Sequence, residues 1–412
     1  MLGSIFLDAG RPELAAELLL AANAQAQVQA SLPAQQILAR ALMRMGRPQA
    51  ASQVIDRSFP AQINESLVSD FLPEWGQILY ESKDWRRLQV IARRIGVIYG
   101  FQPAAQRQRD AGNFYAGVAY HALGRPAEAE AALSAFTRPE AQEPLPGALA
   151  EAYRTLADVY RQQGLTGSEL ANLQAGLELA EERWPEAWLR VADLLHGRPS
   201  EQLSSQAALA RALALDPALE ATELERFESW GRAHLASSGL DPELLRELLA
   251  RQGRAFPADS TDVYLLLALA RLNRDLNQSH AAHLCLDQLE TLVPGFGPAL
   301  DLRAELYALE GLQQRRIAVL LRRVSRPGHP PEAMRALRQA NAEGRLDQDQ
   351  RLVLLQLDGA VSGLLSFARQ ALERGRPDLA LRGLQPALAG AGAELGSEGL
   401  CLAAEAELAL GQ

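Results

Sequence analysis

The apolar positions of this chain are spaced for α-helices and are interrupted by a recurring turn. The tripeptide Gly-Arg-Pro occurs five times, beginning at Gly10, Gly46, Gly124, Gly197 and Gly375. After each of these except Gly197, an alanine follows five residues on, and a leucine or isoleucine follows nine residues on. Glycine can end one helix in the left-handed conformation, and a proline two residues later fits the first turn of the next helix. Each unit is therefore predicted to be a helical hairpin whose alanine allows close packing.

The same register continues along the chain and predicts hairpin turns separated mostly by 31 to 41 residues. These turns are placed at Gly10, Gly46, Lys83, Gly124, Gly164, Gly197, Gly239, Asn277, Gly311, Gly344 and Gly375. Residues 218–260 keep helical periodicity but lose the repeat code, so we expect the stack to be irregular there. A soft boundary near residue 185 separates hairpins at 1–185 from hairpins at 186–412, which we expect to continue the first set.

Several of these units resemble the tetratricopeptide repeat superfamily, whose period is 34 residues. Gly117 and Tyr120 precede the turn at Gly124 as that superfamily's pattern requires, and Ala129 and Leu133 follow it. The match is looser around Gly164, where Glu169 stands in the place of the alanine, and proline replaces the usual aromatic residue after several turns. The resemblance implies an all-α fold, a right-handed superhelix or solenoid of antiparallel helical hairpins.

The charge balance narrows the classes of partner. The formal net charge is −9, which argues against a general nucleic-acid binder because phosphate binding needs a basic face. No run of about 18 apolar residues predicts insertion into a membrane, and no signal peptide is recognisable, so the chain as given is expected to be cytoplasmic. Its ends resemble those of a piece of a longer protein, which would leave a periplasmic location open.

In the resembled superfamily the first helix of each hairpin lines the groove, and exposed positions about six to ten residues before the turn contact the partner. Carried over to this chain, these positions form a row rich in arginine, which could bind carboxylates in an extended peptide. The alternative is that these arginines simply lie on solvent-exposed helix faces and bind nothing. Lys83 is the only lysine, so the Lys/Asn/Arg peptide-carboxylate clamp of some members is not expected. The predicted partner-binding residues are Arg40, Met43, Arg154, Asp158, Arg161, Arg271, Arg274, Glu305, Arg338 and Arg369.

No catalytic or cofactor-binding constellation stands out. The phosphate-binding loop, the nucleophile elbow and the His-Glu-x-x-His zinc motif are all absent from the sequence. His280, His283 and Asp287 share one helix face, but a fourth ligand is lacking, so a solvated polar face is favoured over a metal site. Trp184 and Trp188 are expected to pack between neighbouring hairpins.

The function that this pattern favours is a non-catalytic protein-interaction scaffold that binds a partner peptide or helix in a groove. The alternative is a helical accessory region of a larger enzyme or of a secretion or exopolysaccharide machine, such as a glycosyltransferase. The last helix is also a candidate association surface, because it carries Leu400, Leu402, Leu408 and Leu410.

Overall fold

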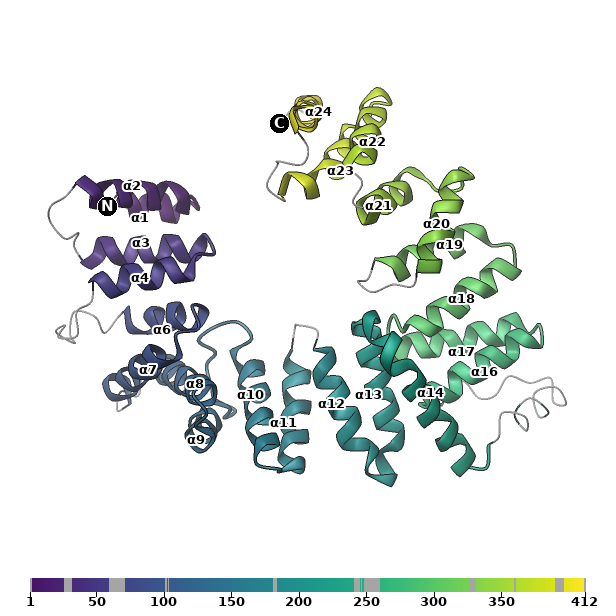
Figure 1. Cartoon of the computed structure of the whole chain (residues 1–412), viewed down its shortest axis with the longest axis horizontal. Coiled ribbons are helices and arrows are strands. Elements are labelled where there is room, and N and C mark those ends of the chain that lie inside the picture. The colour runs from purple at the N-terminus through teal and green to yellow at the C-terminus, as the bar shows by residue number, and fades with distance from the viewer. Residues whose placement is uncertain are drawn as a thin grey trace. The chain divides into compact units, whose positions relative to one another are not determined.

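The structure is a computed structural model of the chain and divides into two compact units, Met1–Arg183 and Trp184–Gln412. All of its described regular elements are helices (Figure 1). In the labels below, helix A is the helix before a hairpin turn and helix B is the helix after it. The described residues are 2–25, 32–58, 71–100, 102, 104–180, 184–240, 245, 247, 260–325, 331–358, 361–389 and 396–410.

The first unit contains five described hairpins in chain order. Neighbouring A helices pack on one another, since α8 contacts both α6 and α10. The helices are α1 (Leu2–Asp8), α2 (Pro12–Gln25), α3 (Leu32–Arg44), α4 (Pro48–Ser58), α6 (Leu72–Glu81), α7 (Trp85–Tyr99), α8 (Gln106–Ala122), α9 (Pro126–Phe136), α10 (Ala148–Gln162) and α11 (Thr166–Leu179).

The second unit begins with a hairpin whose helices are joined by a short 3₁₀ helix, and it ends with α24 packed on α22 and α23. The helices are α12 (Pro185–His196), η2 (Pro199–Glu201), α13 (Gln202–Leu215), η3 (Pro217–Leu219), α14 (Glu220–Ser237), α16 (Val263–Asp275), α17 (Ser279–Leu292), α18 (Gly297–Leu309), α19 (Gln313–Val324), α20 (Pro331–Ala342), α21 (Gln348–Asp358), α22 (Val361–Glu373), α23 (Pro377–Ala389) and α24 (Gly396–Leu410).

The predicted turns share one backbone geometry. Every predicted turn residue except Gly197 has a positive φ, including the two that are not glycine, Lys83 at 59° and Asn277 at 57°. In each of these turns the following amide donates to the carbonyl five residues back; Arg125 N, for example, lies 2.9 Å from Tyr120 O. This is the hydrogen bond of a Schellman cap, in which a left-handed residue closes a helix and satisfies its last carbonyls.

The turn predicted at Gly197 forms differently. Gly197 has φ −68°, and the chain passes through the 3₁₀ helix at Pro199–Glu201 before α13 starts. Gly197 is also the one Gly-Arg-Pro glycine with no alanine five residues on, since Gln202 occupies that place. The turn between α12 and α13 therefore forms at the predicted place, but the left-handed conformation expected of its glycine was wrong.

The repeat code has the predicted packing role. Ala15, Ala51, Ala129 and Ala380 are all fully buried. At the hairpin of α8 and α9 the approach is so close that a Cβ on Gly117 would overlap the Leu133 side chain. Small residues at these sites let the helices pack, and the buried aliphatic residues supply the hydrophobic contact between them.

The segment predicted to be irregular is only partly described. Helix α14 contacts α13 and α16, and its Phe227 lies 5.2 Å from Phe296 and 5.8 Å from Tyr264, measured between ring centroids. Most of residues 241–259, which follow the turn at Gly239, lie outside the described residues. The irregularity of the stack there therefore remains a prediction.

The final helix exposes part of its apolar surface. Leu400, Leu408 and Leu410 are exposed, whereas Leu402 is buried in a cluster with α22 and α23, so its predicted exposure was wrong. The two cysteines differ in the same way: Cys401 on α24 is exposed, and Cys285 is buried, which raises the pKa of its thiol.

Candidate functional site

Most of the predicted groove residues form ion pairs within the chain. Arg40 Nε lies 2.6 Å from Glu74 on the next A helix, and Arg271 Nη1 lies 3.0 Å from Glu228 on the preceding one. These arginines are part of the contacts between hairpins. The predicted row is therefore not a ladder of free cations, and part of its charge is used for packing.

The remaining predicted residues are placed in several environments. Arg338 Nη2 lies 2.6 Å from Asp358, and Arg161 Nη2 lies 2.5 Å from Asp158 on its own helix. Met43 is half-buried and packs against the core of the first unit. The exposed side chains of Arg154 and Arg369 lie on α10 and α22.

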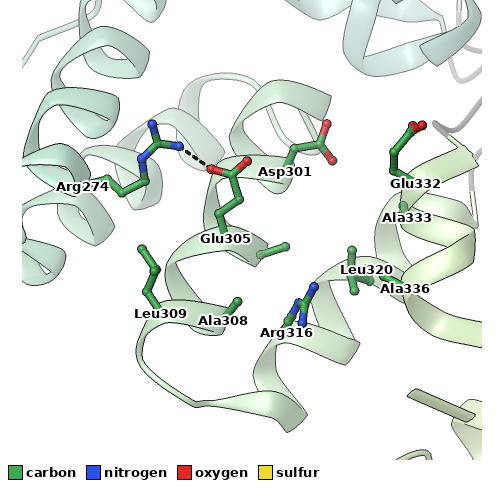
Figure 2. Close-up of a pocket in the computed structure, with 11 residues that line it drawn as sticks. Arg274, Asp301, Glu305, Ala308, Leu309, Arg316, Leu320, Glu332, Ala333 and Ala336 are labelled. Carbon is green, nitrogen blue, oxygen red and sulfur yellow. Dashed lines mark hydrogen bonds and ion pairs between the residues drawn. The ribbon is translucent and has the colours of Figure 1, made fainter. Parts of the chain in front are cut away.

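Arg274 and Glu305 are the two predicted residues that line one pocket together, and they form an ion pair. This pocket, the α18–α20 groove, has a volume of about 750 Å³ and is bounded by A helices α16, α18 and α20 and by helix α19 (Figure 2). Its lining residues are Arg274, Asp301, Ala304, Glu305, Ala308, Leu309, Arg316, Leu320, Glu332, Ala333 and Ala336.

The apolar part of the groove is made mainly of alanine. Ala304 and Ala308 come from α18, and Ala333 and Ala336 from α20, so both walls are short side chains. Leu309 at the end of α18 also lines the pocket and is 70% exposed. The short side chains of the walls leave room for the side chains of another molecule. The exposed Leu309 offers that molecule an apolar contact.

Charged residues lie at both ends of this surface. Figure 2 shows Asp301 and Glu332 at one end of the groove and Arg316 at the other. Burial raises the pKa of the Asp301 carboxyl, Arg323 opposes that shift, and the negative charges of Glu305 and Glu332 add to it. The α18–α20 groove therefore has an acidic end and a basic end.

Behind the acidic end is a buried charge cluster. The Arg323 side chain is almost fully buried, its Nε lies 3.1 Å from Asp301 Oδ1, and its Nη2 bonds Glu220 at the start of α14. Burial lowers the pKa of Arg323, but the bonds and charges of Asp301 and Glu220 outweigh that effect, and its pKa is raised. Gly297 belongs to the same arrangement, because a Cβ there would overlap Glu220 and lie 2.8 Å from Arg323 Cζ.

A smaller pocket of about 320 Å³ lies between A helices α6 and α8 in the first unit. It is lined by Glu74, the partner of Arg40, and by Tyr115, whose hydroxyl has its pKa raised by burial. This pocket is also bounded by neighbouring A helices, as the resemblance predicts for contact surfaces, but it is smaller and its walls are mostly polar.

Other residues singled out in the sequence have partners inside the fold. His283 Nε2 lies 3.2 Å from both carboxylate oxygens of Glu310, and Arg303 Nη2 lies 2.8 Å from Asp287. Trp184 is buried, and Arg211 of α13 lies 4.8 Å over the Trp188 ring of α12. Within the part of the chain that the structure describes, no group of three metal-binding side chains occurs and no helix is long and apolar enough to cross a membrane.

Sequence reasoning missed most of the α18–α20 groove. The positions chosen were mainly six and three residues before each turn, which include Glu305 and Arg274 but pass over Asp301, ten residues before Gly311. The repeat code explains alanines only as packing residues, and Arg316 lies on helix B, outside the positions that the resemblance selects. Asp301 fell inside the window of six to ten residues, so a search of the whole window would have found it.

No family model matches the sequence. No curated protein matches it either. Three solved structures are similar at low sequence identity. The C-terminal part of a TPR repeat-containing protein from Cytophaga hutchinsonii is 13% identical, with 73% of this chain and 97% of that chain covered and a TM-score of 0.37. The TPR domain of P58(IPK) is 14% identical, with 100% and 97% covered and a TM-score of 0.25.

The third structure is Naa15/Naa10 bound to HypK-THB, in which a chain is 15% identical, with 93% of this chain covered and a TM-score of 0.33. This chain spans 61% of that one. The fold of the present chain is evident from its own left-handed turns and buried alanines. The described part of the chain is an all-α helical repeat built from antiparallel hairpins.

Proposed function

We propose that the chain is a non-catalytic protein-interaction scaffold, and that its α18–α20 groove receives a helix or an extended segment of a partner protein. The observation that carries the proposal is the groove itself, with its two alanine walls and the exposed Leu309. Affinity would come from burying apolar side chains between α18 and α20, with charged residues at the rim setting orientation.

The alternative drawn from the sequence is an accessory region of a larger enzyme or secretion machine. It differs from the scaffold proposal because it requires catalytic or secretory parts besides this chain. A groove of this kind would serve either one as a docking surface. Repeat proteins bind through surfaces shared by consecutive repeats, and this groove is shared by three consecutive A helices. The scaffold proposal is therefore the simpler one.

The test is to fill the groove. Ala336→Trp places a large ring between α18 and α20, and Ala318→Trp makes the same change at an exposed position of α19 that does not line the groove. Both variants and the parent chain are used to capture proteins from the native host, with quantification by mass spectrometry and with circular dichroism to check folding. We expect a partner that the parent and Ala318→Trp retain and Ala336→Trp loses.

A second arm tests the predicted arginine row outside the groove. Arg338 and Arg369 are exposed, and neither lines the α18–α20 groove. If the double change Arg338→Gln and Arg369→Gln removes the partner while Ala336→Trp does not, binding takes place along the row and the groove is not the site. A partner retained by every variant would reject both locations.

A further inference from the structure

The charges of the α18–α20 groove point to the chemistry of its occupant. At the acidic end, Asp301 and Glu220 share one buried guanidinium, that of Arg323. An arginine keeps its charge in proteins, so this cluster has two carboxylates for one cation when both are ionised. The Asp301 side chain is 42% exposed, and its carboxylate lines the groove, where a further cation could reach it.

Glu332 adds negative charge at the same end. Its ion pair with Arg335 is 2.6 Å long, but both side chains are about 70% exposed, and exposed pairs of this kind contribute little. The negative charge of Glu332 acts on Asp301, whose pKa it raises. A cation placed between Asp301 and Glu332 would therefore be attracted by two carboxylates at once.

The other end of the groove has the opposite sign. Arg316 is half-buried and lines the groove beside Leu320, and its side chain makes no ion pair or hydrogen bond with any described residue. Arg274 and Glu305 lie on the same side of the groove as Asp301 (Figure 2) and form an ion pair with each other, so together they add no net charge there. Apolar walls thus join an acidic end to a basic end.

We propose that the occupant is a segment of a partner protein with aliphatic side chains along the alanine walls and a lysine or arginine against Asp301 and Glu332. An acidic side chain or a free carboxylate of the same segment would lie against Arg316. This inference rests on the proposed function, because it specifies what the same groove binds. The complementary charges would orient the segment in the groove. They would disfavour a segment whose charged side chains are all acidic.

The probes are two blocked, fluorescein-labelled twelve-residue peptides with the same leucine and alanine core. One carries three lysines at the unlabelled end, and the other carries three glutamates there. Fluorescence anisotropy measures their affinities for the full chain at low and high salt. We expect Glu332→Lys to weaken the lysine peptide about five-fold and to strengthen the glutamate peptide, with both effects smaller at high salt.

Arg316→Glu should do the reverse, weakening the glutamate peptide without weakening the lysine peptide. Glu373→Lys is the matched control, since it makes the same charge change at an exposed position on α22 outside the groove and should alter neither affinity. Glu332 and Arg316 both lie on the surface of their helices, so neither change is expected to prevent folding.

The outcomes separate this inference from the function on which it rests. If both peptides bind with affinities that do not respond to Glu332→Lys or Arg316→Glu, but Ala336→Trp abolishes binding, the groove binds segments and the charge preference is wrong. If binding survives Ala336→Trp, or if neither peptide binds the parent chain, the groove is not a docking site for such segments, and both proposals are overturned.

Discussion

At the scale of single residues, the turns show where a side chain is compatible with left-handed backbone. Asparagine enters this region more easily than most residues, but Lys83 has no such advantage, and the Schellman hydrogen bond from Asp84 N to Leu79 O still forms around it at 2.9 Å. The sequence indicated this turn only because the register of the neighbouring hairpins required one there. Lys83 therefore adopts the left-handed conformation that this helix cap requires, although it is not a glycine or an asparagine.

Glycine has a different role at Gly297, where the constraint is space. We expect Gly297→Ala to destabilise the chain by about 1–3 kcal/mol, because the added methyl group would push Arg323 and Glu220 from their buried positions. At Gly96, in the exposed interior of α7, an added methyl group would extend into open space. Gly96→Ala should therefore stabilise by about 0.5–1 kcal/mol.

Urea unfolding of both variants, followed by circular dichroism at 222 nm, checks the pair. A Gly297→Ala protein as stable as the parent would mean that the arginine and the glutamate are not held as closely as described. The two substitutions are the same chemical change, so the contrast between them isolates the effect of the buried contacts.

At the scale of helices, ion pairs connect neighbouring hairpins. Arg274 with Glu305, 31 residues apart, and Arg226 with Asp193, 33 apart, join A helices, while Arg382 joins α23 to Asp349 on α21. The turns and buried alanines could be predicted because their code lies within ten residues of chain. The ion pairs could not, because each depends on two helices from different hairpins and on the rotamers of long side chains.

The same reasoning explains why the groove was found only in part. Its walls come from three A helices and one B helix, and a helix-by-helix reading of exposed positions does not show which ones face a shared space. Glu305 and Arg274 were identified from their register alone. The roles of Asp301, Arg316 and the alanine walls could be identified only from the arrangement of α18, α19 and α20 in space.

Two ion pairs of this kind should differ strongly in their contribution to stability. Arg40 and Glu74 are both more than 40% exposed, so Arg40→Gln should cost less than about 1 kcal/mol. Arg323→Gln removes the buried cation between Asp301 and Glu220 and should cost about 3–5 kcal/mol. Chemical unfolding of the two single variants tests this, and equal losses would contradict the distinction between exposed and buried pairs.

At the scale of the unit, Arg323 makes a contact that is not expected in a simple stack of repeats. In a solenoid each repeat contacts only its neighbours, yet Arg323 on α19 bonds Glu220 on α14, which is 103 residues away in the sequence. Within the second unit, this bond connects a helix before α16 and α17 to one after them. The stability of α14 should therefore depend on α19.

Hydrogen exchange of the full chain measures this dependence. Arg323→Gln should increase exchange in α14 as well as in α18 and α19, because the connection between them is lost. Arg322→Gln is the control: Arg322 is the adjacent residue, it is partly exposed, and it pairs with Glu290 on α17 instead. An increase in α14 exchange with Arg322→Gln, or none with Arg323→Gln, would show that α14 is not held from α19.

The whole chain also carries two chemically distinct attachment points, one in each unit. Lys83, in the first unit, is the only lysine, and it lies at an exposed turn; Cys401, in the second, is exposed, whereas the other cysteine is buried. After the terminal amine is blocked near neutral pH, an amine-reactive donor dye and a thiol-reactive acceptor dye would label one site each. Energy transfer between the dyes would then report the distance between the two units in solution, without any engineered residue.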